Sequence, residues 1–258
     1  MRIKPVCANL GAEVFGVNAN QPITQYQSKR LRDALRKHLV LLFRDQKLDV
    51  NAQISFAQVF GSLGAIADTL LGLGKRKYPE DDIPECVSVI SNIKVNNEVI
   101  GSLGDGECFW HTDSCFAETP PSASTLYSLE IPSCGGNTAF LNMLDALETL
   151  PDHIRTQVEH LSIRHSQVYD STGAKRPQFK EAKDISLNPG PTHPIIRTLP
   201  EDKTQVLYLG RRLGAYIPGL KVDESEYLLD LLWAHTVQTS RIWSHQWRTG
   251  DLLVWDNR

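Results

Sequence analysis

The sequence predicts an α+β fold that is mainly β, a double-stranded β-helix (jelly roll) with flanking helices. Three observations predict it. Two helical segments come first, at about 25–37 and 51–59. A long run of strand-like segments follows and is interrupted only by short helices. No internal repeat or low-complexity linker divides the chain, so we expect a single domain over 1–258.

The first segments carry clear local signals. Thr24 offers a hydroxyl where a helix can begin, and apolar residues recur at helical spacing through 25–37. The continuous apolar run 39–43 is typical of a strand buried on both faces. A second helix is predicted over 51–59, and Gly61 ends it.

The stretch 64–107 is rich in glycine, proline and charged residues, which predicts a long loop with one strand at 87–90. A loop of that length is typical of a mobile lid or entrance. The later helices are predicted at 143–150, 152–161 and 223–235. The later strands are predicted at 122–130, 137–142, 195–197, 206–209, 243–247 and 252–255. The mouth of a jelly roll built from them would be a natural site for a small molecule.

Composition excludes several classes of protein. The 258 residues are 41% hydrophobic and 22% charged, which is ordinary for a globular protein. A net charge of -3 argues against a nucleic-acid partner. No apolar run reaches the roughly 18–20 residues of a membrane span, and the start lacks an apolar signal segment, so we expect a cytoplasmic protein. The sequence leaves open whether the chain forms a homo-oligomer.

The five cysteines are scattered, and no pair has the spacing of a zinc ribbon or a thioredoxin-type site. We therefore expect reduced thiols that pack as small apolar side chains. Cys108 and Cys115 flank the most informative motif of the chain and would at most line its pocket.

That motif is the pair His111 and Asp113. Side chains two residues apart lie on the same side of an extended strand, so both groups could bind one metal ion. Two such ligands and one further imidazole form the facial triad of non-haem Fe(II) oxygenases, which leaves positions open for a co-substrate and O2. The spacing by itself also fits an ordinary hydrogen-bonded pair. Trp110 and Phe116, which suit an apolar cavity, favour the metal site.

Several motifs in the same order resemble the taurine/2,4-dichlorophenoxyacetate dioxygenase family, whose members depend on Fe(II) and 2-oxoglutarate. The resemblance covers nearly the whole chain. The similar segments are 42–46, 56–63, Trp110–Asp113, 116–121, 132–138, 193–198, 207–208 and 250–258.

The resemblance implies a mechanism and a set of site residues. His111 and Asp113 match the first two iron ligands, and Thr138 matches the threonine that helps hold the distal carboxylate of 2-oxoglutarate. The third iron ligand and the arginine that binds 2-oxoglutarate are expected beyond residue 258. With O2, such an enzyme hydroxylates or desaturates an unactivated C–H bond of a small organic substrate and releases succinate and CO2. The carboxylate at Asp113 disfavours a halogenase.

The substrate is less constrained. The stretch 64–68 lacks the histidine of taurine-specific members, which disfavours taurine. Glu107 matches a position that faces substrate in relatives, and with Asp68 it suggests a substrate that bears an amine.

Two rival interpretations remain open from the sequence. One is a catalytically silent jelly-roll binding protein, which the absence of the third ligand from 1–258 would favour. The other is a different metal-dependent enzyme, such as a Zn²⁺ hydrolase. Release of succinate that depends on 2-oxoglutarate would exclude the second interpretation.

Overall fold

The structure is a computed structural model that describes residues 1–64, 83–104, 106, 108–180 and 182–258. The chain divides into two compact units, and each is described by itself. The first unit consists of 1–63, 121–149 and 234–258. The second unit consists of 64–120 and 150–233.

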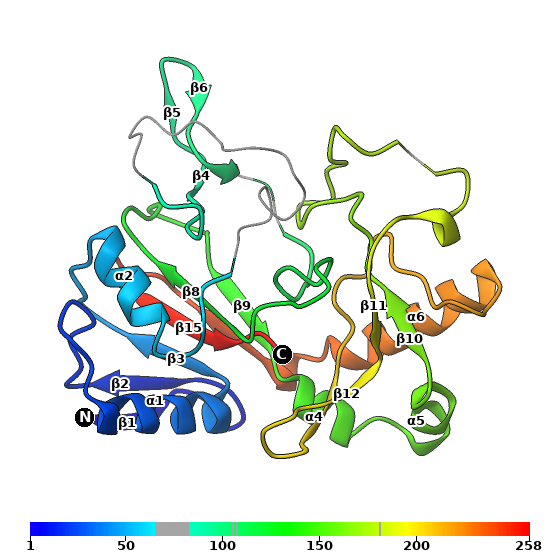
Figure 1. Cartoon of the computed structure of the whole chain (residues 1–258), viewed down its shortest axis with the longest axis horizontal. Helices are drawn as coiled ribbons and strands as arrows, with labels where there is room; N and C mark the ends of the chain where they lie inside the picture. The colour runs from blue at the N-terminus through cyan, green and yellow to red at the C-terminus, as the bar shows by residue number, and fades with distance from the viewer. Residues whose placement is uncertain (65–82, 105, 107, 181) are drawn as a thin grey trace. The chain divides into compact units, whose positions relative to one another are not determined.

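Short helices interrupt a chain that consists mainly of short strands and loops (Figure 1). The helices are α1 (Gln25–His38), α2 (Val50–Ala57), α4 (Met143–Glu148), α5 (Asp152–Val158) and α6 (Val222–Thr236), with 3-10 turns η1 (Ile185–Leu187) and η2 (Thr239–Arg241). The strands before residue 130 are β1 (Arg2–Pro5), β2 (Ala12–Phe15), β3 (Val40–Phe43), β4 (Ile90–Ser91), β5 (Lys94–Val95), β6 (Glu98–Val99), β7 (Ser102–Leu103) and β8 (Ala123–Tyr127). The later strands are β9 (Thr138–Leu141), β10 (Ser162–Arg164), β11 (Thr192–Pro194), β12 (Ile196–Thr198), β13 (Gln205–Leu207), β14 (Ile242–His245) and β15 (Leu252–Asp256).

A five-stranded mixed sheet organises the first unit, in the order β1-β2-β3-β15-β8 (Figure 1). β2 and β3 run parallel, and the other neighbours run antiparallel. The strand nearest the C-terminus, β15, therefore lies between β3 and β8, with Leu253 opposite both Leu42 and Leu126. A second antiparallel pair, β9 with β14, places Thr138 opposite His245.

The central strands are apolar on both faces because each face packs against a separate cluster. Leu41 and Phe43 point into a core that contains residues of α1 and α2. Val40 and Leu42 point the other way, toward Leu253 and a group of aromatic rings. Alternate residues of one strand lie on opposite faces of a sheet, so an uninterrupted apolar run is what two packed faces require.

Local signals set the beginning and end of α1. The Thr24 side chain accepts the backbone N–H of Gln27, and the Gln27 side chain accepts the backbone N–H of Thr24, which completes a capping box. Leu39 ends the helix in the left-handed conformation, at φ 64°. The predicted helix is thus confirmed, and the predicted strand begins at Val40 rather than at Leu39.

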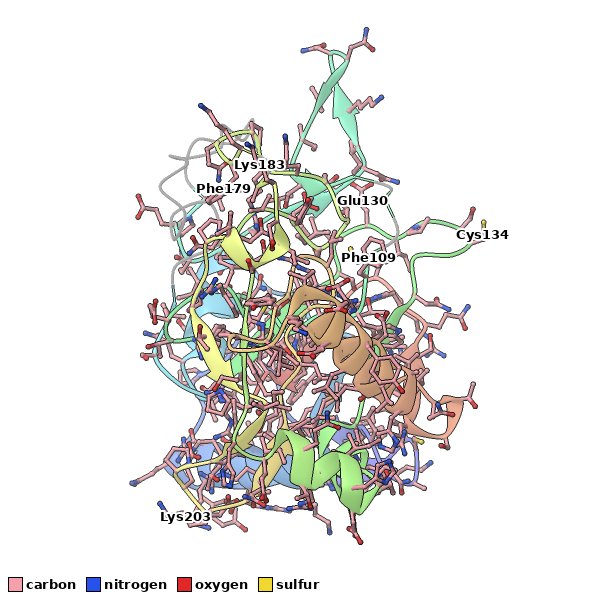
Figure 2. All side chains as sticks on the ribbon, turned by 90° about the vertical axis from the view of Figure 1, so that its right-hand side faces the viewer. Phe109, Glu130, Cys134, Phe179, Lys183 and Lys203 are labelled. Carbon is pink, nitrogen blue, oxygen red and sulfur yellow. The ribbon has the colours of Figure 1, made fainter. Side chains whose placement is uncertain are left out.

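Short strand pairs make up the sheets of the second unit: β10 with β11, β12 with β13, β4 with β7 and β5 with β6. β12 and β13 are joined by a tight turn, in which the Lys203 backbone N–H donates to the Leu199 carbonyl at the lower edge of Figure 2. Among the residues that the structure describes, these sheets form no closed barrel.

Most predicted elements are present, with shifts of a few residues at their ends. The strand expected at 87–90 begins only at Ile90. The strands β1, β2, β5, β6, β7, β10 and β11 were not predicted. The proposed lid, 64–107, lies partly outside the described residues, which omit 65–82, 105 and 107. No helix of the described part is long and apolar enough to cross a membrane.

Candidate active site

His111 and Asp113 do not lie on a regular strand, and this part of the sequence prediction was wrong. His111 forms a single antiparallel bridge with Arg211, and the Thr112 backbone N–H donates to the Gly210 carbonyl. The chain then turns at once, because Ser114 has φ 50° and its carbonyl accepts the N–H of Ala117. The segments around His111 and Arg211 do not pair beyond this single bridge, because the turn at Ser114 follows it directly.

The two side chains nevertheless meet. His111 Nε2 lies 3.4 Å from Asp113 Oδ1, and the side chains are 29% and 33% exposed. His111 Nδ1 lies 2.7 Å from the carbonyl oxygen of Phe109, a residue labelled in Figure 2. A carbonyl only accepts hydrogen bonds, so Nδ1 carries a hydrogen and Nε2 is the nitrogen that faces Asp113.

The surroundings of His111 and Asp113 favour positive charge between their side chains. Burial acts to lower the pKa of His111, but the hydrogen bond and charge of Asp113 and the Phe109 carbonyl outweigh it, so the pKa is raised. Asp113 therefore favours positive charge at Nε2. A metal ion could supply that charge, because imidazole nitrogen and carboxylate oxygen are ordinary ligands of Fe(II) and the Nδ1–H bond already orients the ring. The donor set therefore fits a divalent metal.

Thr138 belongs to the first unit, where it begins β9. Its Oγ1 accepts the indole N–H of Trp247 at 3.0 Å. His245 lies opposite Thr138 across the strand pair, and its imidazole meets the Trp247 ring edge-on at 4.7 Å. Thr138 is therefore held by an aromatic residue that the sequence prediction missed.

The carboxylate of Asp251 contacts His245 and forms an ion pair with Arg44. Asp251 is fully buried, and its Oδ2 accepts from Arg44 Nη1 at 2.6 Å, His245 Nε2 at 3.0 Å and the Arg248 backbone N–H at 2.8 Å. Burial lowers the pKa of His245 despite the opposing effect of the Asp251 charge. The imidazole is therefore neutral, and its single hydrogen lies on Nε2 because the carboxylate needs a donor.

Comparison with known proteins identifies the family. The sequence profile described as "Taurine catabolism dioxygenase TauD, TfdA family" matches residues 2–258. The chain belongs to the TauD, TfdA family. This dioxygenase is 30% identical to the (S)-phenoxypropionate/alpha-ketoglutarate-dioxygenase of Delftia acidovorans, over 100% of the chain and 87% of that protein. It is 29% identical to the alpha-ketoglutarate-dependent sulfate ester dioxygenase of Pseudomonas putida, over 99% of the chain and 81% of that protein.

A solved structure agrees. The dioxygenase superposes on the crystal structure of AAD-2 in complex with Mn(II) and N-oxalylglycine with a TM-score of 0.75 and 27% identity, over 100% of the chain and 88% of AAD-2. The resemblance predicted from the motifs is confirmed. The protein is a 2-oxoglutarate-dependent oxygenase that uses Fe(II) and O2 on a small organic substrate.

Glu107 and Asp68 lie outside the described residues. Within the described ranges, no third His, Cys, Asp or Glu joins His111 and Asp113 in a group that could hold a metal ion. His193, which precedes Pro194, instead bonds the Ala117 carbonyl at 3.0 Å.

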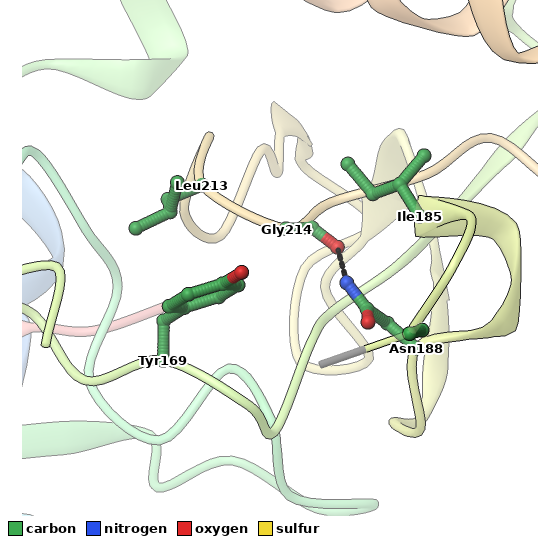
Figure 3. Close-up of a pocket in the computed structure, with 6 residues that line it drawn as sticks. Tyr169, Ile185, Asn188, Leu213 and Gly214 are labelled. Carbon is green, nitrogen blue, oxygen red and sulfur yellow. Dashed lines mark hydrogen bonds between the residues drawn. The ribbon is translucent and has the colours of Figure 1, made fainter. Parts of the chain in front are cut away.

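A small cavity lies elsewhere in the second unit of the dioxygenase (Figure 3). Its volume is about 150 Å³, and neither His111 nor Asp113 lines it. Tyr169 and Leu213 form one side, and Asn188 donates to the Gly214 carbonyl across the other at 3.5 Å. The cavity provides no metal ligand, so we assign it no part in the chemistry.

Tight packing surrounds the bridge between His111 and Arg211. Gly210 has φ 63°, and a Cβ there would lie 2.2 Å from Nδ1 of His165. Only glycine fits between this imidazole and the segment that carries His111 and Asp113. Cys115 packs beside it, and burial raises the pKa of its thiol to about 11, so the residue behaves as the apolar side chain that the sequence predicted.

His165 makes the folded dioxygenase sensitive to acid. It is 1% exposed, and within the described structure neither ring nitrogen has a hydrogen-bond partner. Burial lowers its pKa from 6.5 to about 3, with the charges of His193, Arg211 and Arg197 acting in the same direction. The unfolded chain takes up this proton first, so the free energy of unfolding should fall as pH drops through that window, by about 1.4 kcal/mol per pH unit.

We expect His165→Leu to lose this dependence, because leucine has a similar volume and no proton to bind. Urea unfolding across the window measures it, and the variant should become more stable than the unaltered chain at the acid end. His153→Gln, at an exposed histidine on α5, is the matched control and should follow the unaltered chain. Parallel pH profiles for His165→Leu and the unaltered chain would contradict the assignment.

Proposed function

We propose that His111 and Asp113 bind the Fe(II) of this dioxygenase. The observation that carries the proposal is the 3.4 Å approach of His111 Nε2 to Asp113 Oδ1 while Nδ1 is bonded to the Phe109 carbonyl. The ring is oriented by one nitrogen and presents the other to the carboxylate, which is how metal-binding histidines are usually held. The third ligand and the arginine for 2-oxoglutarate stay predictions of the family resemblance.

Thr138 is proposed to donate its hydroxyl to the distal carboxylate of 2-oxoglutarate. Fe(II), when bound, supplies the reaction of 2-oxoglutarate with O2 that oxidises a C–H bond of the substrate. The protein would hold the metal with one neutral ligand, His111, and one anionic ligand, Asp113. It would also supply the Thr138 hydroxyl as a hydrogen-bond donor to the distal carboxylate.

The same reasoning supports a double-stranded β-helix over one domain, 1–258. The likeness to AAD-2 over the whole chain favours it, as does the strand-rich composition of the later chain. A single domain predicts one cooperative unfolding transition that is the same for fluorescence and circular dichroism. Two separate transitions would contradict it.

The substrate is proposed to be a small organic molecule whose C–H bond is hydroxylated or desaturated. The named relatives act on anions, a phenoxypropionate and a sulfate ester, whereas Glu107 suggests an amine. Succinate release should be measured over a panel of aryloxy acids, sulfate esters and amines of matched size. Stimulation by anions alone would remove the proposed role of Glu107, and stimulation by no member would contradict the substrate class.

Thr138→Val tests the co-substrate site. Valine keeps the branched shape and removes the donor, so the KM for 2-oxoglutarate should rise about tenfold to a hundredfold, the range for a hydrogen bond to a charged group. The measurement is succinate release at varied 2-oxoglutarate. Thr138→Ser is the control, since serine keeps the hydroxyl and should retain a KM close to the original. An unchanged KM for the valine variant would contradict the assignment.

A further inference from the structure

The hydrogen-bonding capacity of Thr138 is limited by its neighbour. A threonine hydroxyl has one hydrogen to donate and two lone pairs that accept, whereas an indole nitrogen only donates. Trp247 Nε1 lies 3.0 Å from Thr138 Oγ1, so the indole occupies a lone pair of this oxygen. The hydroxyl hydrogen cannot point at the indole nitrogen and stays available for another acceptor.

The Trp247 ring is held in place on two sides. It packs against the apolar cluster of Leu10, Val40, Leu42 and Leu253. Its other contact is the imidazole of His245, with the two ring planes at 83° and the centroids 4.7 Å apart. Because His245 pairs with Thr138 across β9 and β14, the strand register sets the distance from Trp247 to the hydroxyl.

His245 is in turn held by charge. Its Nε2–H donates to Asp251 Oδ2, which also binds Arg44 at 2.6 Å. His245 and Asp251 are each 1% exposed at the side chain, so little water competes for these bonds. The path from Arg44 to Thr138 therefore consists of direct contacts within the first unit.

We infer that Trp247 is a positioning residue: by donating to Thr138 Oγ1 it commits the Thr138 hydroxyl to act as a donor to the distal carboxylate of 2-oxoglutarate. The inference rests on the proposed role of Thr138. A carboxylate only accepts hydrogen bonds, so it needs a donor. A hydroxyl whose oxygen already accepts the indole N–H can still donate its own hydrogen, and it therefore suits a carboxylate. The indole N–H thus contributes to co-substrate selection without touching the co-substrate.

Trp247→Phe tests this inference, because phenylalanine keeps a ring against His245 and loses the donor. Isothermal titration of the Mn(II)-loaded chain should show 2-oxoglutarate binding weakened about threefold to tenfold, the range of one hydrogen bond between neutral groups. Binding of 2-oxobutyrate, which lacks the distal carboxylate, should stay within about twofold of the original. Trp243→Phe is the matched control, since Trp243 also contacts His245 and should show neither change.

A double-mutant cycle separates positioning from packing. In a Thr138→Val background the Trp247→Phe substitution should add no further loss, whereas in a Thr138→Ser background it should keep its full effect. Urea unfolding of each variant shows that the compared proteins are folded. These are the results expected if Trp247 acts through the hydroxyl.

Three outcomes would overturn the inference. Equal weakening toward both keto acids would mean that Trp247 supports the fold and not the carboxylate contact. Weakening by Thr138→Val but not by Trp247→Phe would leave the proposed function standing and reject the role of Trp247. No weakening of 2-oxoglutarate binding by Thr138→Val would reject the proposed site of Thr138, and the role of Trp247 with it.

Discussion

Replacing Asp113 with alanine is expected to weaken Mn(II) or Fe(II) binding more than a hundredfold, because the loss of groups that merely support metal ligands already costs about tenfold to a hundredfold. The described residues supply only His111 beside it, and one neutral imidazole holds a divalent cation poorly. The turnover of 2-oxoglutarate should fall at least as far. Calorimetric metal titration and succinate release measure the two effects.

Two further variants make the result specific. Asp113→Asn keeps the shape and one oxygen but loses the charge, so its metal affinity should lie between that of the unaltered chain and that of the alanine variant. Asp230→Asn removes an equal charge from an ion pair with Arg212 that is 69% exposed at Asp230, and should bind metal normally. Unchanged metal binding in Asp113→Ala would show that the ligands lie elsewhere.

Replacing Asp251 with alanine is expected to lower the free energy of unfolding by about 3–5 kcal/mol, the usual cost of removing one partner of a buried ion pair. The substitution leaves Arg44, only 22% exposed, without its carboxylate, and it removes the acceptor of His245 and of the Arg248 N–H. The same change should loosen the contact of His245 with Trp247. Urea denaturation at neutral pH measures the loss.

A double substitution tests whether the loss of stability comes from the charge of Arg44 that is left without its partner. Arg44→Met with Asp251→Leu replaces both charged groups by apolar ones of similar size, and it should recover a large part of the stability. Glu226→Gln removes one partner of an ion pair with Arg212 that is 39% exposed at Glu226; it is the surface control and should cost less than about 1 kcal/mol. A loss below about 1 kcal/mol for Asp251→Ala would contradict the assigned role of the pair.

Elements set by neighbouring residues could be predicted from the sequence. The capping box at Thr24 and Gln27 and the apolar run of β3 depend on contacts a few residues apart or on simple alternation, and both are confirmed. The short strands β10 and β11 carry no such pattern. Each gains stability only from its pairing partner, with Ile163 opposite His193 across 30 residues of chain, so local signals could not reveal them.

The candidate site divides in the same way. His111 and Asp113 were chosen from their spacing and from motif order, and Thr138 from motif order alone; the family to which that order belongs is confirmed. Their surroundings were not predictable: a regular strand was expected at His111, whereas a bridge to Arg211 and a turn at Ser114 bring the two side chains together. Trp247 gave one signal, its place two residues after His245, but nothing in the sequence marked its bond to Thr138.

The sequence by itself determined the family, the catalytic class and the type of residue at each proposed position. Each of these depends on which side chain stands at a given position, and the sequence states that directly. The tertiary structure alone decided which groups meet. The pairing of β9 with β14 brings Trp247 to Thr138, and the fold of the first unit brings Arg44 to Asp251. These contacts join residues more than 100 positions apart, and their distances depend on strand register and packing rather than on any local pattern.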